Sequence, residues 1–216
     1  LHKTSFKYID GLLLYAYKSS NVFSNNLVIR DCNFLLKNYG DFASYESAVS
    51  LVKLNNIGTL VLHHSLFLRV KGTLLLINDT QTFINSNNKY IELSSYYCGT
   101  ICMNANKAAS VNKVIFANNN FISCVSEFYG SVGLSIIASG KEWYTYREKE
   151  YYEYFKIYSN PRILGLVIDV QNISFTACIT NEWLPFFQFH ALQSKVSGLY
   201  NFSVSLINCN FIKDNK

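Results

Sequence analysis

A pattern of eight residues recurs five times along this 216-residue chain and limits the folds that the chain can adopt. Each copy has apolar residues at its first and third positions, a polar residue at its fifth and Phe at its eighth. The copies are LVIRDCNF (27–34), LVLHHSLF (60–67), VIFANNNF (114–121), IDVQNISF (168–175) and VSLINCNF (204–211). Apolar residues two positions apart lie on the same side of a strand. Repeats of this kind are typical of folds whose successive passes stack to bury a shared core.

The last residue of each copy forms a column of five aromatic residues. Its members are Phe34, Phe67, Phe121, Phe175 and Phe211, which lie 33, 54, 54 and 36 residues apart. Each step of 54 residues corresponds either to two passes of the chain or to one pass with a long insertion. The composition also favours strands, since the chain has 16 Phe and 16 Tyr but only 2 Pro. We therefore predict a parallel solenoid in which the Phe rings stack along one internal line.

Three residues before each Phe stands a polar residue. The members of this column are Asp31, His64, Asn118, Asn172 and Asn208. Asn and Asp tolerate left-handed backbone geometry, so the column predicts a corner whose side chains form a structural ladder along the stack. The alternative is that five unrelated loops happen to use similar residues.

The apolar-x-apolar-x-Asn-Cys-x-Phe motif is followed by a polar turn and a Gly-containing apolar strand, as in GSVGLSIIA (130–138). This arrangement resembles the pectin-lyase-like right-handed parallel β-helix superfamily. The segment SLINCNFIKDN (205–215) is most similar to the non-enzymatic, repeat-rich surface proteins of that superfamily. The resemblance covers about residues 27–216. It implies an all-β fold, a right-handed parallel β-helix, with residues 1–216 forming one domain.

Two features leave the interpretation open. Leu35, Leu68, Ile122 and Ile212 follow the column Phe residues and are also apolar, so the sequence does not show which side of this strand faces inward. Residues 139–162 are charged and Tyr-rich and match no column. We expect them to form a protruding insertion, as a helix or a long hairpin, although EYFKIY (153–158) has the alternation of a strand.

The chain lacks the residue clusters that catalysis on this fold implies. The superfamily's enzymes act on acidic polysaccharides through clustered Asp residues, but no two Asp residues here are adjacent or spaced as Asp-x-Asp. They are Asp10, Asp31, Asp41, Asp79, Asp169 and Asp214. His63 and His64 are neighbours and are expected on opposite faces of a strand, which suits no chelating pair. We expect no catalytic, cofactor-binding or metal-binding residues.

Charge and hydropathy exclude further classes of partner. The net charge of +5 is spread along the chain without a Lys/Arg run, which argues against nucleic-acid binding. No segment approaches the roughly 18 apolar residues of a membrane-spanning helix.

Six cysteines occupy three kinds of position. Cys32 and Cys209 share a column but lie several passes apart, beyond the reach of a disulfide. Cys124 and Cys178 both lie three residues after a column Phe and can bond only if their passes are adjacent. Cys98 and Cys102 are the predicted disulfide, with half of a zinc site as the alternative.

Three N-glycosylation sequons begin at Asn78, Asn172 and Asn201. Asn78 and Asn201 have turn-like surroundings, so we expect glycans there. Asn172 belongs to the ladder column, and we expect little occupancy because an internal ladder would bury its amide. The sequons, the resemblance and the predicted disulfide favour an extracellular or cell-surface location.

The favoured function is an extracellular structural or adhesive module of a surface protein or fibre. The expected partners are further coils or other copies of the same protein, because neither end shows a cap and the chain reads as a fragment of a longer solenoid. The alternative is a polysaccharide-binding or polysaccharide-degrading β-helix protein. For that alternative, Trp143, Tyr144 and Tyr146 of the insertion offer rings on which sugars stack.

Overall fold

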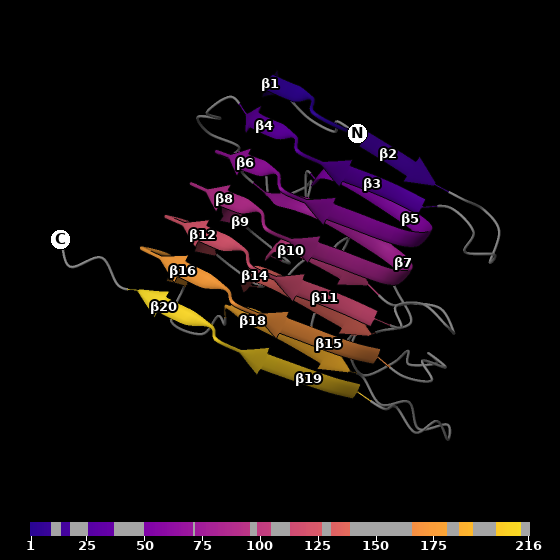
Figure 1. The fold of residues 1–216 in the computed structure, drawn as a ribbon, viewed down its shortest axis with the longest axis vertical. Coiled ribbons are helices and arrows are strands. Elements are labelled where there is room, and N and C mark those ends of the chain that lie inside the picture. The colour runs from indigo at the N-terminus through magenta and orange to yellow at the C-terminus, as the bar shows by residue number, and fades with distance from the viewer. Residues whose placement is uncertain are drawn as a thin grey trace, which may run out of the picture.

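In the computed structural model, most of the described residues form three parallel β-sheets (Figure 1). The described residues are 1–9, 14–17, 26–36, 50–70, 72–95, 99–104, 113–126, 131–138, 166–180, 186–191 and 202–212. Within them the structure is all β without a helix, and every paired strand runs parallel to its neighbour. The predicted insertion at 139–162 lies outside these residues.

The strands of each sheet follow one another in chain order, apart from one branch point. The seven-stranded sheet contains β1 (Ser5–Ile9), β4 (Asn33–Leu36), β6 (Leu66–Leu68), β8 (Lys89–Ile91), β12 (Asn120–Ile122), β16 (Ser174–Thr176) and β20 (Asn210–Ile212). The three-stranded sheet contains β9 (Ser94–Ser95), β13 (Val125–Ser126) and β17 (Ile179–Thr180). The 10-stranded sheet contains β2 (Leu14–Tyr17), β3 (Asn26–Arg30), β5 (Ser50–His63), β7 (Thr73–Ser86), β10 (Gly99–Asn104), β11 (Lys113–Ala117), β14 (Ser131–Ala138), β15 (Leu166–Gln171), β18 (Phe187–Ala191) and β19 (Phe202–Ile207).

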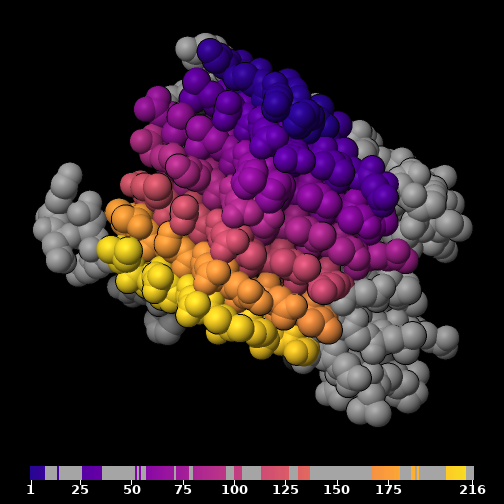
Figure 2. All heavy atoms as spheres, in the orientation of Figure 1, coloured from indigo at the N-terminus to yellow at the C-terminus, as the bar shows by residue number. Residues whose placement is uncertain are grey.

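The long strands β5 and β7 divide the 10-stranded sheet into two branches. The first half of β7 pairs with β10, and its second half pairs with β11. Each turn of the chain therefore adds one segment to each of the two branches and then one strand to the seven-stranded sheet. Three of these turns also add a strand to the three-stranded sheet. We call one such turn a pass. Successive passes lie in layers from β1 to β20, which appear as colour bands in Figure 2.

The column Phe residues lie in register on neighbouring strands. Phe34 pairs with Phe67, and Phe121 pairs directly with Phe175. The second step of 54 residues is therefore one pass with a long connection. The first step contains an additional pass, because Tyr90 lies between Phe67 and Phe121.

The aromatic rings form a continuous stack through the interior. Ring centroids are 4.7 Å apart for Phe34–Phe67, 5.3 Å for Phe67–Tyr90, 4.5 Å for Tyr90–Phe121, 4.9 Å for Phe121–Phe175 and 5.3 Å for Phe175–Phe211. Phe6 extends the stack, with its ring 5.1 Å from that of Phe34. Every member from Phe34 to Phe175 is buried, whereas Phe211 on the last strand is 55% exposed.

Side-chain alternation resolves the orientation that the sequence left open. Because each column Phe points inward, the next residue points outward. Leu68 and Ile122 are accordingly half-buried, and Ile212 is exposed. The other wall of the core comes from the first and third positions of the repeat, whose buried members are Ile29, Leu60, Leu62, Val114, Phe116, Ile168 and Val170.

Candidate functional site

All five members of the predicted corner column adopt left-handed backbone geometry. Their φ angles are 53° for Asp31, 49° for His64, 54° for Asn118, 52° for Asn172 and 52° for Asn208. Lys3 and Asn87 occupy the same position on two further passes, with φ angles of 48° and 56°. The corner amides donate to the neighbouring pass, as from Asn118 to the Gln171 carbonyl at 2.9 Å. A single residue in this conformation turns the chain from one sheet to the next.

Three corner side chains form an amide ladder on the outside of the molecule. Asn208 Nδ2 donates to Asn172 Oδ1 at 3.0 Å, and Asn172 Nδ2 donates to Asn118 Oδ1 at 2.9 Å. All three residues are exposed. The expectation that burial would shield Asn172 is therefore wrong. The left-handed residue interrupts the alternation of the strand, so it points outward and the residue after it points inward.

A second polar ladder, absent from the sequence-based interpretation, lies inside the corner. It consists of the residues two positions before the stacked rings. The Asn88 amide N–H donates to Asn119 Oδ1 at 2.9 Å, and the Ser65 amide donates to Asn88 Oδ1 at 2.7 Å. The Cys32 amide in turn donates to Ser65 Oγ at 3.2 Å. These four residues are buried. Their side chains therefore satisfy backbone groups that turn away from the sheets.

One repeat departs from the pattern at two positions, and a buried hydrogen-bonded pair explains both departures. In the segment 83–90, Asn85 replaces an apolar residue and Tyr90 replaces Phe. Both side chains are fully buried, and the Tyr90 hydroxyl lies 2.8 Å from Nδ2 and 3.0 Å from Oδ1 of Asn85. Burial raises the pKa of Tyr90 far above its usual value, so the hydroxyl stays neutral. The two departures from the repeat satisfy each other's hydrogen bonds.

At the N-terminal end, the corner column becomes charged. Asp31 Oδ2 lies 3.2 Å from both His2 Nε2 and Arg30 Nε, and Asp31 Oδ1 lies 3.6 Å from His64 Nδ1. His63 and His64 are not on opposite faces as expected, because their ring centroids are 3.8 Å apart in a stacked arrangement. The left-handed His64 is exposed, and its ring stacks on that of the half-buried His63.

The surroundings of His63 disfavour its protonation. Its Nδ1 lies 2.7 Å from Ser86 Oγ. Partial burial, the neighbouring His64 and the Arg30 guanidinium lower the pKa of His63 below its usual value of 6.5. Among the described residues, no group of three or more His, Cys, Asp or Glu side chains is arranged to hold a metal ion.

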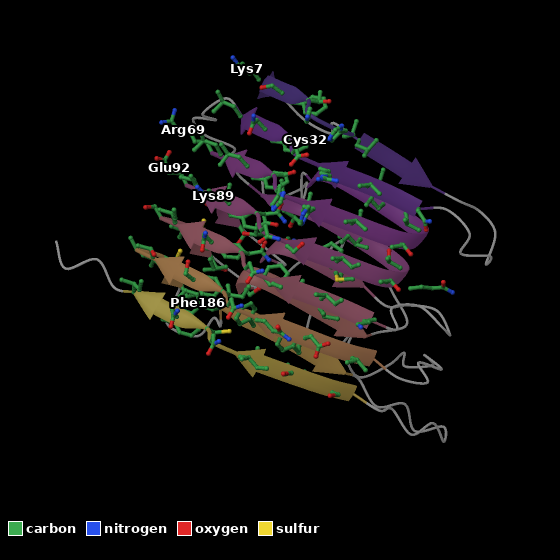
Figure 3. All side chains as sticks on the ribbon, viewed as in Figure 1. Lys7, Cys32, Arg69, Lys89, Glu92 and Phe186 are labelled. Atoms are coloured by element: carbon green, nitrogen blue, oxygen red, sulfur yellow. The ribbon has the colours of Figure 1, made fainter. Side chains whose placement is uncertain are left out.

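A second corner follows the seven-stranded sheet two residues after the stacked ring. Arg69, Glu92, Ser123 and Ala177 have φ angles of 60°, 54°, 53° and 52° there. Arg69 Nε lies 2.8 Å from Glu92 Oε2, and both side chains are exposed. In Figure 3 this pair lies along one edge of the molecule, with Lys7 of β1 further along the same edge, two layers before Arg69. Such exposed pairs contribute little to stability.

The structure places the remaining predicted site residues at separate positions. The backbone of Asn78 lies within β7, in register with Asn55 and Asn104, rather than in a turn. Asn201, Cys98 and the aromatic residues Trp143, Tyr144 and Tyr146 lie outside the described residues. Asp169 is half-buried in β15 and is in register with Ile115 and Ser205. The described carboxylates therefore share no common site.

The structure describes five of the six cysteines. The free thiols among the described residues belong to Cys32, Cys124, Cys178 and Cys209. Cys32 and Cys209 lie on β-strand layers at different ends of the stack and do not meet. Cys124 and Cys178 lie on adjacent passes, with the Cys124 amide nitrogen 3.4 Å from Cys178 Sγ. Cys102 is buried in β10, and its predicted bond to Cys98 stays a prediction.

No helix within the described residues has the length and hydropathy required to cross a membrane. Comparison of the chain with protein-family models, with curated proteins and with solved structures found no match.

Proposed function

We propose that the three parallel sheets are a stretch of a right-handed parallel β-helix of the pectin-lyase-like kind, with residues 139–162 as an insertion. The in-register stacking of the rings and of both corners supports this proposal, since each pass repeats the path of the one before it. The handedness follows from the strong preference for right-handed connections between parallel strands.

On this fold we propose an extracellular structural or adhesive module. The observation that carries the proposal is the continuous internal stack of aromatic rings beside a hydrogen-bonded ladder of buried amides. Close packing and satisfied buried polar groups make a rigid body, which suits a spacer or a display surface. The alternative, binding or cleavage of polysaccharides, predicts products or retention on an acidic polysaccharide in assays with and without Ca²⁺. We expect neither.

The proposed partner is a second copy or a further pass of the same fold. The described part of the last pass leaves large apolar side chains uncovered, with exposed fractions of 37% for Val204, 55% for Leu206, 55% for Phe211 and 54% for Ile212. Among the described strands, β19 and β20 are the last of their sheets, and an edge strand is suited to further parallel pairing.

Residues 1–216 are therefore expected to associate end to end as the protein concentration rises. Sedimentation velocity measures the association. Phe211→Asp is expected to keep the protein monomeric by placing a charge on the open edge. The matched control is Val167→Asp, since Val167 is 42% exposed on β15, a strand that is already paired on both sides. A wild-type protein that stays monomeric, or equal effects of the two substitutions, would contradict the proposed end-to-end contact.

Glycan occupancy tests the proposed extracellular location and the position of each sequon. We expect more glycan at Asn172 than at Asn78, because Asn172 is exposed whereas the backbone of Asn78 lies between two neighbouring strands. This order reverses the expectation from the sequence, while occupancy at Asn201 stays a prediction. The measurement is site-resolved mass spectrometry of protein secreted from a eukaryotic host. Greater occupancy at Asn78 than at Asn172 would argue against the register of β7.

A further inference from the structure

Cys124 and Cys178 occupy the same position on adjacent passes. The residues after them, Val125 and Ile179, are in register in the three-stranded sheet. The Ile179 amide donates to the Cys124 carbonyl at 2.9 Å, and the Cys124 amide donates to Cys178 Sγ at 3.4 Å. The two cysteines therefore lie side by side on two adjacent passes that are hydrogen-bonded to each other.

We propose that Cys124 and Cys178 form a disulfide that ties the pass containing β12 and β13 to the pass containing β16 and β17. Parallel neighbours lie roughly 4.8 Å apart, within the range of about 4.4–6.8 Å between the Cα atoms of bonded cysteines. Both thiols are free in the structure, which is the reduced state of this pair. Within the described ranges, the other free cysteines adjoin residues of another kind, Ser65 for Cys32 and Ile173 for Cys209.

The environments of the two thiols determine the order of the chemistry. Cys178 is half-buried, and its hydrogen bond with the Cys124 side chain lowers the pKa of Cys178 against the effect of burial. The same hydrogen bond, together with burial, raises the pKa of Cys124. Cys178 is therefore the thiolate that attacks, and Cys124 is the thiol that resolves.

The oxidant in this proposal is a small-molecule disulfide. The Cys178 thiolate attacks one of its sulfurs, an S–S bond forms, and the first small thiolate leaves. Cys124 then loses its proton, and its sulfur attacks Cys178 Sγ, which releases the second small thiolate. The two protein thiols are oxidised by two electrons in total, and the small disulfide is reduced to two thiols.

The bond would close a loop of 54 residues that contains the strands from β13 to β16. Closing a loop restricts the unfolded chain more than the folded chain. The disulfide would therefore stabilise the pairing of the two passes against unfolding.

The test uses the whole chain, reduced with dithiothreitol and then incubated with oxidised glutathione. Peptide mapping without reduction is expected to yield a peptide linked through Cys124 and Cys178. The melting temperature is expected to rise by about 10 °C and to fall again on reduction. Persisting free thiols, glutathione retained on Cys178, or linkage of either cysteine to another partner would overturn the proposal.

Two substitutions separate this bond from other oxidation. Cys178→Ser is expected to remove most of the rise in melting temperature, because a bond between Cys98 and Cys102 closes only a short loop. Cys32→Ser is expected to retain the rise. An equal rise in the Cys178→Ser protein would assign the stabilisation to another pair, such as Cys98 and Cys102, and would overturn the proposal. The peptide map of the wild-type protein decides the matter if a variant does not fold.

Discussion

Replacing Phe121 with Ala is expected to lower the free energy of unfolding by about 3–5 kcal/mol. The Phe121 ring is fully buried, with ring centroids 4.5 Å from Tyr90 and 4.9 Å from Phe175. Its removal deletes the contacts between two passes and leaves a cavity that flanking strands, held by ladder hydrogen bonds, cannot close. Urea denaturation followed by circular dichroism measures the change.

The matched control is Phe211→Ala, which changes the same column on the last strand. Phe211 is 55% exposed, and its ring contacts those of Phe175 at 5.3 Å and Phe186 at 4.9 Å while the side toward solvent stays uncovered. We expect a loss of about 1 kcal/mol, because the ring removes less surface from water and its loss creates no closed cavity. A loss below about 1 kcal/mol for Phe121→Ala would mean that this ring faces solvent, and the internal stack would be wrong.

Replacing Asn119 with Ala is expected to lower the free energy of unfolding by about 3 kcal/mol, which is large for a polar side chain. Asn119 Oδ1 accepts the Asn88 amide at 2.9 Å, and Asn119 Nδ2 donates to the Asn85 carbonyl at 3.0 Å. The substitution leaves both backbone groups buried without these partners. Each unsatisfied group costs about 1–3 kcal/mol.

The adjacent residue provides the control for this effect. Asn118→Gly removes an amide from the exposed ladder while allowing the left-handed backbone, whose φ is 54°. We expect a change below about 1 kcal/mol in the same urea experiment, since water replaces the lost hydrogen bond. Equal losses for the two substitutions would show that the two ladders are not separated into an inner and an outer one.

The pass that contains Tyr90 does not follow the eight-residue pattern of the other passes. The segment 83–90 carries Asn85 and Tyr90 at positions that are apolar and Phe in the other copies, so the alignment passed over it. The two residues are compatible with the core only as a pair, because their side chains bond each other. A polar residue five positions before a Tyr was the signal that could have found it.

The inner amide ladder also lacks a distinctive signal in the sequence. Asn88 and Asn119 each follow another Asn, and the column of Asn, Asp and His residues beside them was the more regular of the two. At this corner the side chain of the left-handed residue faces outward, and the side chain of the next residue faces inward. Which of two neighbouring amides is buried therefore depends on a backbone conformation, not on residue type.

The sequence by itself determined the repeated strand, the aromatic column and the corner column, because alternation along a strand and the tolerance of Asn for left-handed geometry are local properties. Only the tertiary structure decided which passes are neighbours, which amides are buried and which cysteines meet. Two steps of equal length, Phe67 to Phe121 and Phe121 to Phe175, contain two passes and one pass respectively. Hydrogen bonds between passes set these relations, and such bonds join residues far apart in the chain.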